Sequence, residues 1–446
     1  MSTAADKALL KRIAKSSTGE FKVKTPKLGE NVFREPYFWN PIDNGSYHGR
    51  GNNRIRFDIP REHIWDFETG WFTAEVTLIS DGIPVNADPA YIRLGQGSWQ
   101  VMERVRHLDN LQPIEEIFPY NLIMNFQWVF EQSQTYVQTY GPDLLGIGTR
   151  AQRNAWGAIT KTYVFPLDMG WISAGPFPAK FINRTQSIEI FLADPNQVIE
   201  SNMGALNYSL SNCELHAYKL TSKFPGVISD IKLGVSWEDS FEAFVKSGNY
   251  QVMLDYWDWY QNQPITNTGD YLIPVKTAAI QGIFSVFGNT LNLTDPLQND
   301  KLLTFPKLNV SQYYLRVFAK IYPEQPVECR DNAIQAYMFY VNWVNAWHIN
   351  AFPGSDPTNP DPINEVPVNI AEYNSTAFSM IADFRSVRNV PSINPIFSTN
   401  DCTSDIRFYL RFDGGAPPVG TVLYHFVRSS TVFGISAEGM PYTLLA

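Results

Sequence analysis

The sequence is poor in the residues that build covalent or metal-bound frameworks. Its 446 residues include three cysteines, Cys213, Cys329 and Cys402, which are widely spaced and form no CxxC pair. This pattern argues against a disulfide framework or a structural zinc site and favours folding in a reducing compartment. The sequence has no apolar run of about 18 residues and no apolar stretch near residue 1, so neither a membrane span nor a secretory signal is expected.

Motifs that carry catalysis are also scarce. The sequence contains no Walker A motif, no GxSxG and no HExxH, and no two histidines lie three or four residues apart. Gly146-Ile-Gly148-Thr-Arg-Ala151 matches a dinucleotide fingerprint by letter, but no βαβ pattern surrounds it, so we expect a loop over 141–157. We expect no enzyme activity, no cofactor and no metal site. The histidines are His48, His63, His107, His216, His348 and His425.

Aromatic residues, in contrast, are abundant. The chain has 29 Phe, 22 Tyr and 12 Trp, and 44% of its residues are hydrophobic. Aromatic residues favour strands, and they dominate buried contacts between proteins. The composition therefore favours β structure with a substantial core and extensive interfaces, and the length fits two large β domains.

The net charge of −9 is unevenly distributed. Residues 1–28 carry seven basic and two acidic side chains, a charge of +5, which leaves −14 for the rest of the chain. Such an arm can contact phosphates or anionic lipid, or it can be a solvated terminus. The acidic body is a poor candidate for a nucleic-acid surface. The basic residues of the arm are Lys7, Lys11, Arg12, Lys15, Lys22, Lys24 and Lys27.

Strand-like segments recur through the body and fall into two groups. They are rich in β-branched and aromatic residues, and turn residues bound them. A helix is expected after Pro119 and another within 334–347, whereas 98–110 fits either state and 353–367 reads as a long loop. The predicted strands cover 53–59, 71–80, 162–169, 187–194 and 211–221, and then 250–260, 271–287, 312–323, 376–384, 404–412 and 421–435.

These groups predict an all-β chain with two halves of similar size. The predicted divisions are a basic arm (1–32), a first β domain (33–225), a linker (226–245) and a second β domain (246–446). Antiparallel sandwiches account for strands at uneven spacing with long loops and a few inserted helices. The eight-stranded version of such a sandwich is the jelly roll.

Seven segments carry a more specific resemblance. They resemble the strands of the double jelly-roll major capsid proteins of double-stranded DNA viruses, the lineage of adenovirus hexons, virophages and polinton-like viruses. The segments are TYVFPLDMGW (162–171), SIEIFLADPNQVI (187–199), NCELHAYKL (212–220), YLIPVKTAAIQGIFSVF (271–287), AFSMIADFRSV (377–387), CTSDIRFYLRF (402–412) and TVLYHFVRSSTVFGISAEG (421–439).

This resemblance implies two consecutive eight-stranded jelly rolls and a homotrimer with a pseudo-hexagonal outline. It also implies assembly into an icosahedral virion shell, together with penton and minor capsid proteins. The basic arm would then face genome DNA or an inner membrane, or tie neighbouring capsomers together. The virion is the expected location, after synthesis in the cytoplasm or nucleus of a host cell whose receptor is unknown.

The segment DYWDWY (255–260) has two interpretations. Asp255 and Asp258 among aromatic residues resemble the paired carboxylates of a glycosidase, with Trp257, Trp259 and Tyr260 available to stack on a sugar. The same three aromatic residues are also candidates for a contact between subunits, which we favour. The alternatives to a shell protein with two rolls are therefore a carbohydrate-binding or carbohydrate-cleaving β sandwich, and an RNA-virus capsid protein with one roll and a projecting domain.

Overall fold

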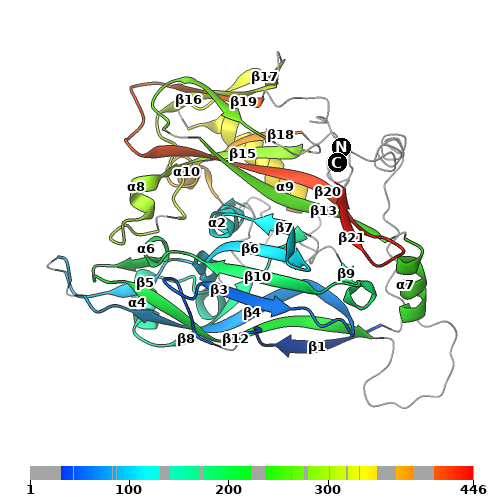
Figure 1. The fold of residues 1–446 in the computed structure, drawn as a ribbon. Helices are drawn as coiled ribbons and strands as arrows, with labels where there is room; N and C mark the ends of the chain where they lie inside the picture. The colour runs from blue at the N-terminus through cyan, green and yellow to red at the C-terminus, as the bar shows by residue number, and fades with distance from the viewer. Residues whose placement is uncertain are drawn as a thin grey trace, which may run out of the picture.

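Two β sandwiches, one above the other in Figure 1, make up most of the described part of the chain. The basic arm, residues 222–236 and the predicted loop 353–367 lie outside the described residues. The computed structural model describes residues 32–43, 45–82, 84–86, 88–130, 141–170, 175–221, 237–248, 250–262, 264–275, 280–300, 302–317, 320–330, 332–348, 368–384 and 406–444.

The first sandwich is formed by the chain up to Thr221. Its strands are β1 (Phe33–Trp39), β2 (Tyr47–His48), β3 (Arg54–Asp58), β4 (Ile64–Ile79), β5 (Ile92–Leu94), β6 (Met102–Asp109), β7 (Gln112–Ile117), β8 (Lys161–Pro166), β9 (Pro176–Phe177), β10 (Gln186–Leu192), β11 (Ile199–Ser201) and β12 (Asn207–Thr221). Its helical segments are η1 (Ser98–Val101), α2 (Tyr120–Phe130), η2 (Gly141–Leu145), α4 (Arg150–Gly157), η3 (Ala179–Phe181) and α6 (Pro195–Val198).

The second sandwich follows helix α7 (Trp237–Lys246). Its strands are β13 (Gln251–Asn262), β14 (Gly269–Ile273), β15 (Ile280–Asn289), β16 (Val310–Val317), β17 (Lys320–Glu328), β18 (Met380–Asp383), β19 (Ile406–Phe412), β20 (Thr421–Ile435) and β21 (Pro441–Leu444). Its helices are α8 (Thr290–Leu293), α9 (Ile334–His348) and α10 (Ile370–Tyr373).

Both sandwiches have the same strand order. In the first, the sheets run β1-β12-β4-β8 and β3-β10-β6-β7; in the second, they run β13-β20-β15-β18 and β14-β19-β16-β17. When the eight strands of each half are counted in chain order, both halves read 1-8-3-6 and 2-7-4-5. All of these pairs are antiparallel. Two packed four-stranded sheets in this order form a jelly roll, which confirms the predicted fold class.

Strand β12 shows how the sequence keeps one sheet face in the core. Tyr208 and Leu210 are buried at even positions, whereas Leu215 and Ala217 are buried at odd positions. The change of phase follows from a bulge in the pairing with β4 at Asn212, whose φ of 51° lies in the left-handed region that Asn tolerates. Without this extra residue, the second part of the strand would present its apolar side chains to solvent.

Helix α2 joins the first roll to the second. It is apolar almost all round, and ten of its residues are buried, as expected of a helix enclosed between layers. The ring of Phe126 lies 5.9 Å from that of Trp257 and 5.0 Å from the rings of both Phe284 and Phe426. The hydroxyl of Tyr340 on α9 donates to the carbonyl of Phe130 at 2.9 Å. The first roll is thus anchored by aromatic packing on the second (Figure 1).

A buried group of charges, here called the charge clamp, forms a second contact between the rolls. It consists of Arg93, Arg153, Glu200 and Asp300. Glu200 Oε2 accepts from Arg93 Nε at 2.7 Å and from Arg153 Nη1 at 3.1 Å, while Oε1 accepts from the Asp300 amide at 2.7 Å. Arg153 Nη2 donates to Asp300 Oδ1 at 2.9 Å. Two positive and two negative charges balance one another, which makes their burial tolerable.

One sequence prediction needs correction. The segment 141–157 is not a simple loop, because it contains η2 and helix α4. Thr149 and Gln152 form a capping box at the start of α4, a short-range signal that the neighbouring glycines obscured. The predicted linker includes most of α7, which buries Trp237, Phe241 and Val245 at a spacing of four residues. The helices expected after Pro119 and within 334–347 are confirmed as α2 and α9.

The charge clamp predicts a large effect of a nearly isosteric substitution. Glu200→Gln leaves two buried guanidinium groups without their central carboxylate, so we expect the free energy of unfolding to fall by about 3 kcal/mol. Urea unfolding monitored by tryptophan fluorescence measures this change. Glu242→Gln, which removes an exposed Lys246 pair, is the matched control and should cost less than about 1 kcal/mol. Equal losses in the two variants would mean that the clamp contributes no more than a surface ion pair.

Candidate functional site

The aromatic segment of β13 faces the junction between the rolls. Trp257 is only 8% exposed, and its ring lies 5.9 Å from Phe126 and 5.5 Å from Phe284, with the Arg428 guanidinium 5.4 Å from its centroid. The structure thus assigns Trp257 to a contact within one chain. Trp259 is partly buried against Phe118 and Tyr424, and Tyr260 is also partly buried. A role of these three residues between subunits stays a prediction, and Trp259 and Tyr260 have more free surface for it.

The two aspartates of the same segment occupy unfavourable positions for a glycosidase pair. Asp255 and Asp258 lie three residues apart on a continuous strand that pairs with β20 along its whole length. Positions at an odd separation on a strand belong to opposite faces of the sheet. The backbone geometry therefore does not favour the carbohydrate hypothesis.

The histidines do not gather into a reactive site. Among the described residues, no group of three or more His, Cys, Asp or Glu could hold a metal ion. His63 precedes β4, where its ring lies 5.4 Å from the ring of Trp65 and burial lowers its pKa. Asp66 is part of β4 and pairs with Arg34 Nη2 at 2.7 Å.

One buried histidine has partners that resemble a catalytic triad. The Ser285 hydroxyl lies 2.7 Å from His425 Nδ1, and His425 Nε2 lies 2.9 Å from Asn262 Oδ1. Ser285 and His425 are completely buried, and burial lowers the pKa of His425 to about 3. The ring is therefore neutral, with Nε2 donating to Asn262 and Nδ1 accepting from Ser285. Because no substrate can reach this serine in the folded chain, the three residues form a structural hydrogen-bond network.

The remaining sequence candidates are buried or lie outside the described residues. Cys213 and Cys329 are buried, and burial raises the pKa of both thiols to about 12, which makes them poor nucleophiles. Cys402 and the basic arm lie outside the described residues. Within the described part of the chain, no helix has the length and hydropathy needed to cross a membrane.

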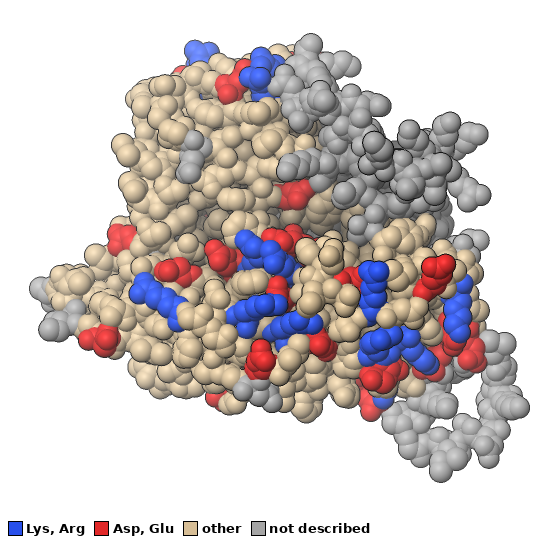
Figure 2. Space-filling view, in the orientation of Figure 1, with Lys and Arg blue, Asp and Glu red and all other residues tan. Residues whose placement is uncertain are grey.

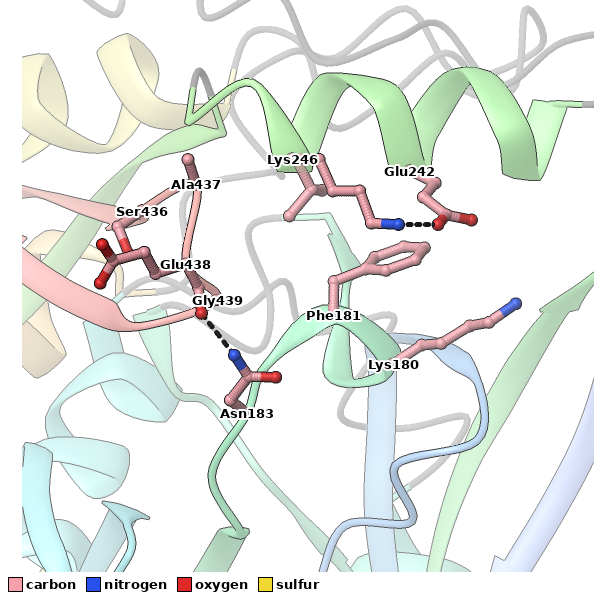
Figure 3. A pocket seen from close by; sticks show the side chains of 10 residues that line it. Lys180, Phe181, Asn183, Glu242, Lys246, Ser436, Ala437, Glu438 and Gly439 are labelled. Atoms are coloured by element: carbon pink, nitrogen blue, oxygen red, sulfur yellow. Dashed lines mark hydrogen bonds and ion pairs between the residues drawn. The ribbon is translucent and has the colours of Figure 1, made fainter.

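An open pocket lies at the edge of the contact between the rolls (Figure 3). Its volume is about 280 Å³, and its walls come from η3 and the following turn, from α7 and from the turn between β20 and β21. Lys246 pairs with Glu242 above the ring of Phe181. The Asn183 backbone amide donates to the carbonyl of Gly439 at 3.1 Å, and its side-chain amide donates to the carbonyl of Glu438. The Asn183 bonds hold the last hairpin against the first roll, and the ring of Phe181 packs against Phe241 of α7. We assign the pocket to this packing.

The outer face of the sheet β3-β10-β6-β7 carries a cluster of charges that the sequence analysis did not anticipate. Figure 2 shows Lys and Arg in a band across the first roll, over this sheet. We call it the arginine face. It comprises Arg54 and Arg56 on β3, Glu189 and Phe191 on β10, Arg104 and Arg106 on β6, with Asp58 and Glu116 at its margins.

The register of three strands creates this cluster. Glu189 is the Cα partner of both Arg56 and Arg106, and Phe191 is the partner of both Arg54 and Arg104. The sequence signal is the pair of Arg-x-Arg repeats, because residues two apart on a strand share one face. That β10 lies between the two repeats follows only from the strand order.

Comparisons with known proteins give a consistent result. No family model and no curated protein matches the sequence. The Faustovirus major capsid protein is similar in structure, with a TM-score of 0.58 at 10% identity over 97% of this chain and 98% of that one. PBCV-1 VP54, as fitted into the virophage Sputnik, has a TM-score of 0.59 at 9% identity over 93% of this chain and 97% of that one.

The Sputnik virophage structure itself is similar along most of its length, with a TM-score of 0.55 at 9% identity over 93% of this chain and 88% of that one. At such identities, the likeness concerns the fold. Since it extends over both rolls, the chain has the double jelly-roll fold that the resemblance implied.

The placement of Trp257 predicts how two neighbouring tryptophans differ. Trp257→Ala opens a cavity between the rolls, so we expect it to lower the free energy of unfolding by about 3–5 kcal/mol. Trp259→Ala removes a partly buried ring from the same strand and should cost less, roughly 1–2 kcal/mol. Urea denaturation of both variants compares the losses. A smaller loss for Trp257→Ala would contradict its assignment to the contact between the rolls.

Proposed function

We propose that this protein is a major capsid protein that forms trimers and assembles into an icosahedral virion shell. The observation that carries the proposal is the presence of two rolls with the same strand order, in a chain whose fold matches major capsid proteins over nearly its whole length. Three such chains around a threefold axis provide six similar rolls. A capsomer built this way has a pseudo-hexagonal outline and can tile a closed shell.

The alternative functions have less support. An RNA-virus capsid protein with one roll and a projecting domain does not fit a chain that devotes both halves to complete rolls. A carbohydrate enzyme needs two carboxyl groups close enough to flank one glycosidic bond. Positions 255 and 258 lie on opposite faces of strand β13, which does not favour that arrangement. We therefore infer a structural rather than an enzymatic role.

The proposal includes partners beyond a second copy of the chain. A closed shell needs fivefold positions, so penton proteins and minor capsid proteins are expected partners. The basic arm is the proposed contact with genome DNA or an inner membrane, because its charge is opposite to that of the body. The virion is the proposed location, with synthesis in a reducing host compartment, in keeping with three thiols that have no disulfide pattern.

The solution mass tests the capsomer directly. We expect light scattering to give three times the chain mass of 50.7 kDa, and negative-stain images to show hexagonal outlines. The reason is that a threefold ring closes all of its equivalent contacts, whereas a monomer leaves them exposed. A protein that stays monomeric over a range of salt and pH would contradict the proposal.

The basic arm makes a separate prediction. Replacing Lys7, Lys11, Arg12 and Lys15 with Gln should leave the trimer intact and weaken binding to duplex DNA or anionic vesicles. The slope of log affinity against log salt for DNA should decrease by up to about 3.6, since each phosphate contact contributes about 0.9. Lys180→Gln with Lys246→Gln is the control in the body and should leave the slope unchanged. Unchanged binding by the arm variant to both anions would remove the arm from this role.

A further inference from the structure

We propose that the arginine face docks a second copy of this chain, and that the docking element is formed by the described residues of the loop between β4 and β5, 80–82, 84–86 and 88–91. The inference rests on the proposed function, because it assigns one contact between neighbouring chains of the capsomer. It is carried by the described charges, burial and hydrogen bonds of the two surfaces.

The arginine face presents positive charge outward. The Glu189 side chain is 3% exposed, whereas that of Arg54, which binds it, is 51% exposed. Arg106 likewise reaches Glu189 at 3.7 Å and Glu116 at 2.8 Å. A guanidinium has five N–H donors, so one edge can hold a carboxylate of its own sheet while the other binds a carboxylate from a partner.

The composition of the arginine face favours binding to the carboxylates of a protein partner over binding to a nucleic acid. Its four arginines are offset by Asp58, Glu116 and Glu189, which leaves a net charge of +1. Tight binding to nucleic acid needs many unneutralised cations along the phosphate backbone. In contrast, a few carboxylates at fixed positions can enter a row of alternating charges without strong repulsion.

The face also has an apolar centre. Phe191 is partly exposed between the two pairs of arginines, with the guanidinium carbons of Arg104 and Arg106 at 5.7 and 5.2 Å from its ring centroid. A complementary partner therefore combines carboxylates with an apolar side chain.

The loop 80–91 has this combination. It projects from the first roll, at the left in Figure 1. No Lys or Arg occurs between Arg61 and Arg93, so the loop carries only the negative charges of Asp81 and Asp88. Both aspartates are exposed, and between them Val85 is 66% exposed. An exposed apolar side chain between two carboxylates matches a phenylalanine between arginines.

The loop is held in shape before it meets a partner. The fully buried Asn202 accepts from the Val85 amide at 2.8 Å through its carbonyl and from the Tyr91 amide at 2.9 Å through Oδ1. Its side-chain amide donates to Asn86 Oδ1 at 2.9 Å. Gly82 packs so closely on Gly204 that an added Cβ would lie 2.3 Å from a backbone nitrogen. Such preorganisation lowers the entropy cost of docking.

The two surfaces are different parts of one chain, so their contact is heterologous. Each copy offers its loop to one neighbour and its arginine face to the other, and a contact of this kind forms a closed ring when the rotation between copies closes. A trimer with threefold symmetry requires such a head-to-tail contact, which a twofold interface cannot supply.

A charge swap tests the pairing. Arg54→Glu with Arg104→Glu should raise the dissociation constant of the trimer at least tenfold, measured by sedimentation at about 0.15 M salt. Asp81→Arg with Asp88→Arg should do the same. All four changes in one chain should restore the trimer, because the attraction is re-formed with its signs exchanged. The matched control is Arg330→Glu with Arg411→Glu, two exposed arginines of the second roll that also pair with a carboxylate, which should leave the trimer unchanged.

The outcomes separate this inference from the proposed function. A wild-type monomer would overturn the capsomer itself, whereas a wild-type trimer that tolerates both reversals would overturn only the docking. Loss of the trimer without restoration by the fourfold variant would overturn the pairing of loop and face. Loss of duplex-DNA binding in the arginine variant, with the trimer intact, would instead assign the face to nucleic acid. If a reversal disturbs the fold, as seen by circular dichroism, Arg54→Gln with Arg104→Gln replaces it. The docking is then supported by a weaker trimer and overturned by a trimer of unchanged affinity.

Discussion

The packing of helix α2 against the second roll is the contact on which the rest of the architecture depends. A jelly roll buries the inner faces of its two sheets and leaves the outer faces polar, so two rolls in tandem have no general reason to stay together. Phe126 holds the two rolls together, because its ring packs among aromatic rings of β13, β15 and β20. The charge clamp then fixes one orientation, since its carboxylates and guanidinium groups are satisfied only when Glu200 meets Asp300 across the junction. The chain therefore behaves as one building block.

Because aromatic residues are used to join the two rolls, only some of the surfaces of the chain are left to bind partners. Aromatic residues that read from the sequence as exposed anchors, Trp257 above all, are used within the chain to join its halves. The triad-like arrangement of Ser285, His425 and Asn262 is buried in the second roll. The polar outer faces of the sheets and the projecting loops remain available to partners. Such surfaces suit a protein that functions by associating with other copies of itself.

The parts of this structure that were predictable from the sequence are those set by local patterns. Strands such as β10 and β20 can be predicted from their β-branched and aromatic residues, and α2 and α9 can be predicted from their apolar spacing. The helix α4 was missed although Thr149 and Gln152 carry its capping signal, because glycines before it suggested a loop. The arginine face and the charge clamp could not be predicted, since both join residues that lie tens to hundreds of positions apart. Strand order alone brings them together, and no local pattern encodes it.

The two halves are related by a structural symmetry that is not evident from their sequences. Helix α2 lies between the fifth and sixth strands of the first roll, and α9 lies between the fifth and sixth strands of the second. These equivalent insertions meet at the junction, where Phe130 contacts Tyr340 with ring centroids 5.6 Å apart. Like insertions that face each other imply that the rolls are related by an approximate rotation as well as by a shared strand order. An object with two such similar units supplies six around a threefold axis, so the same packing that makes the chain rigid also gives its proposed trimer a nearly hexagonal outline.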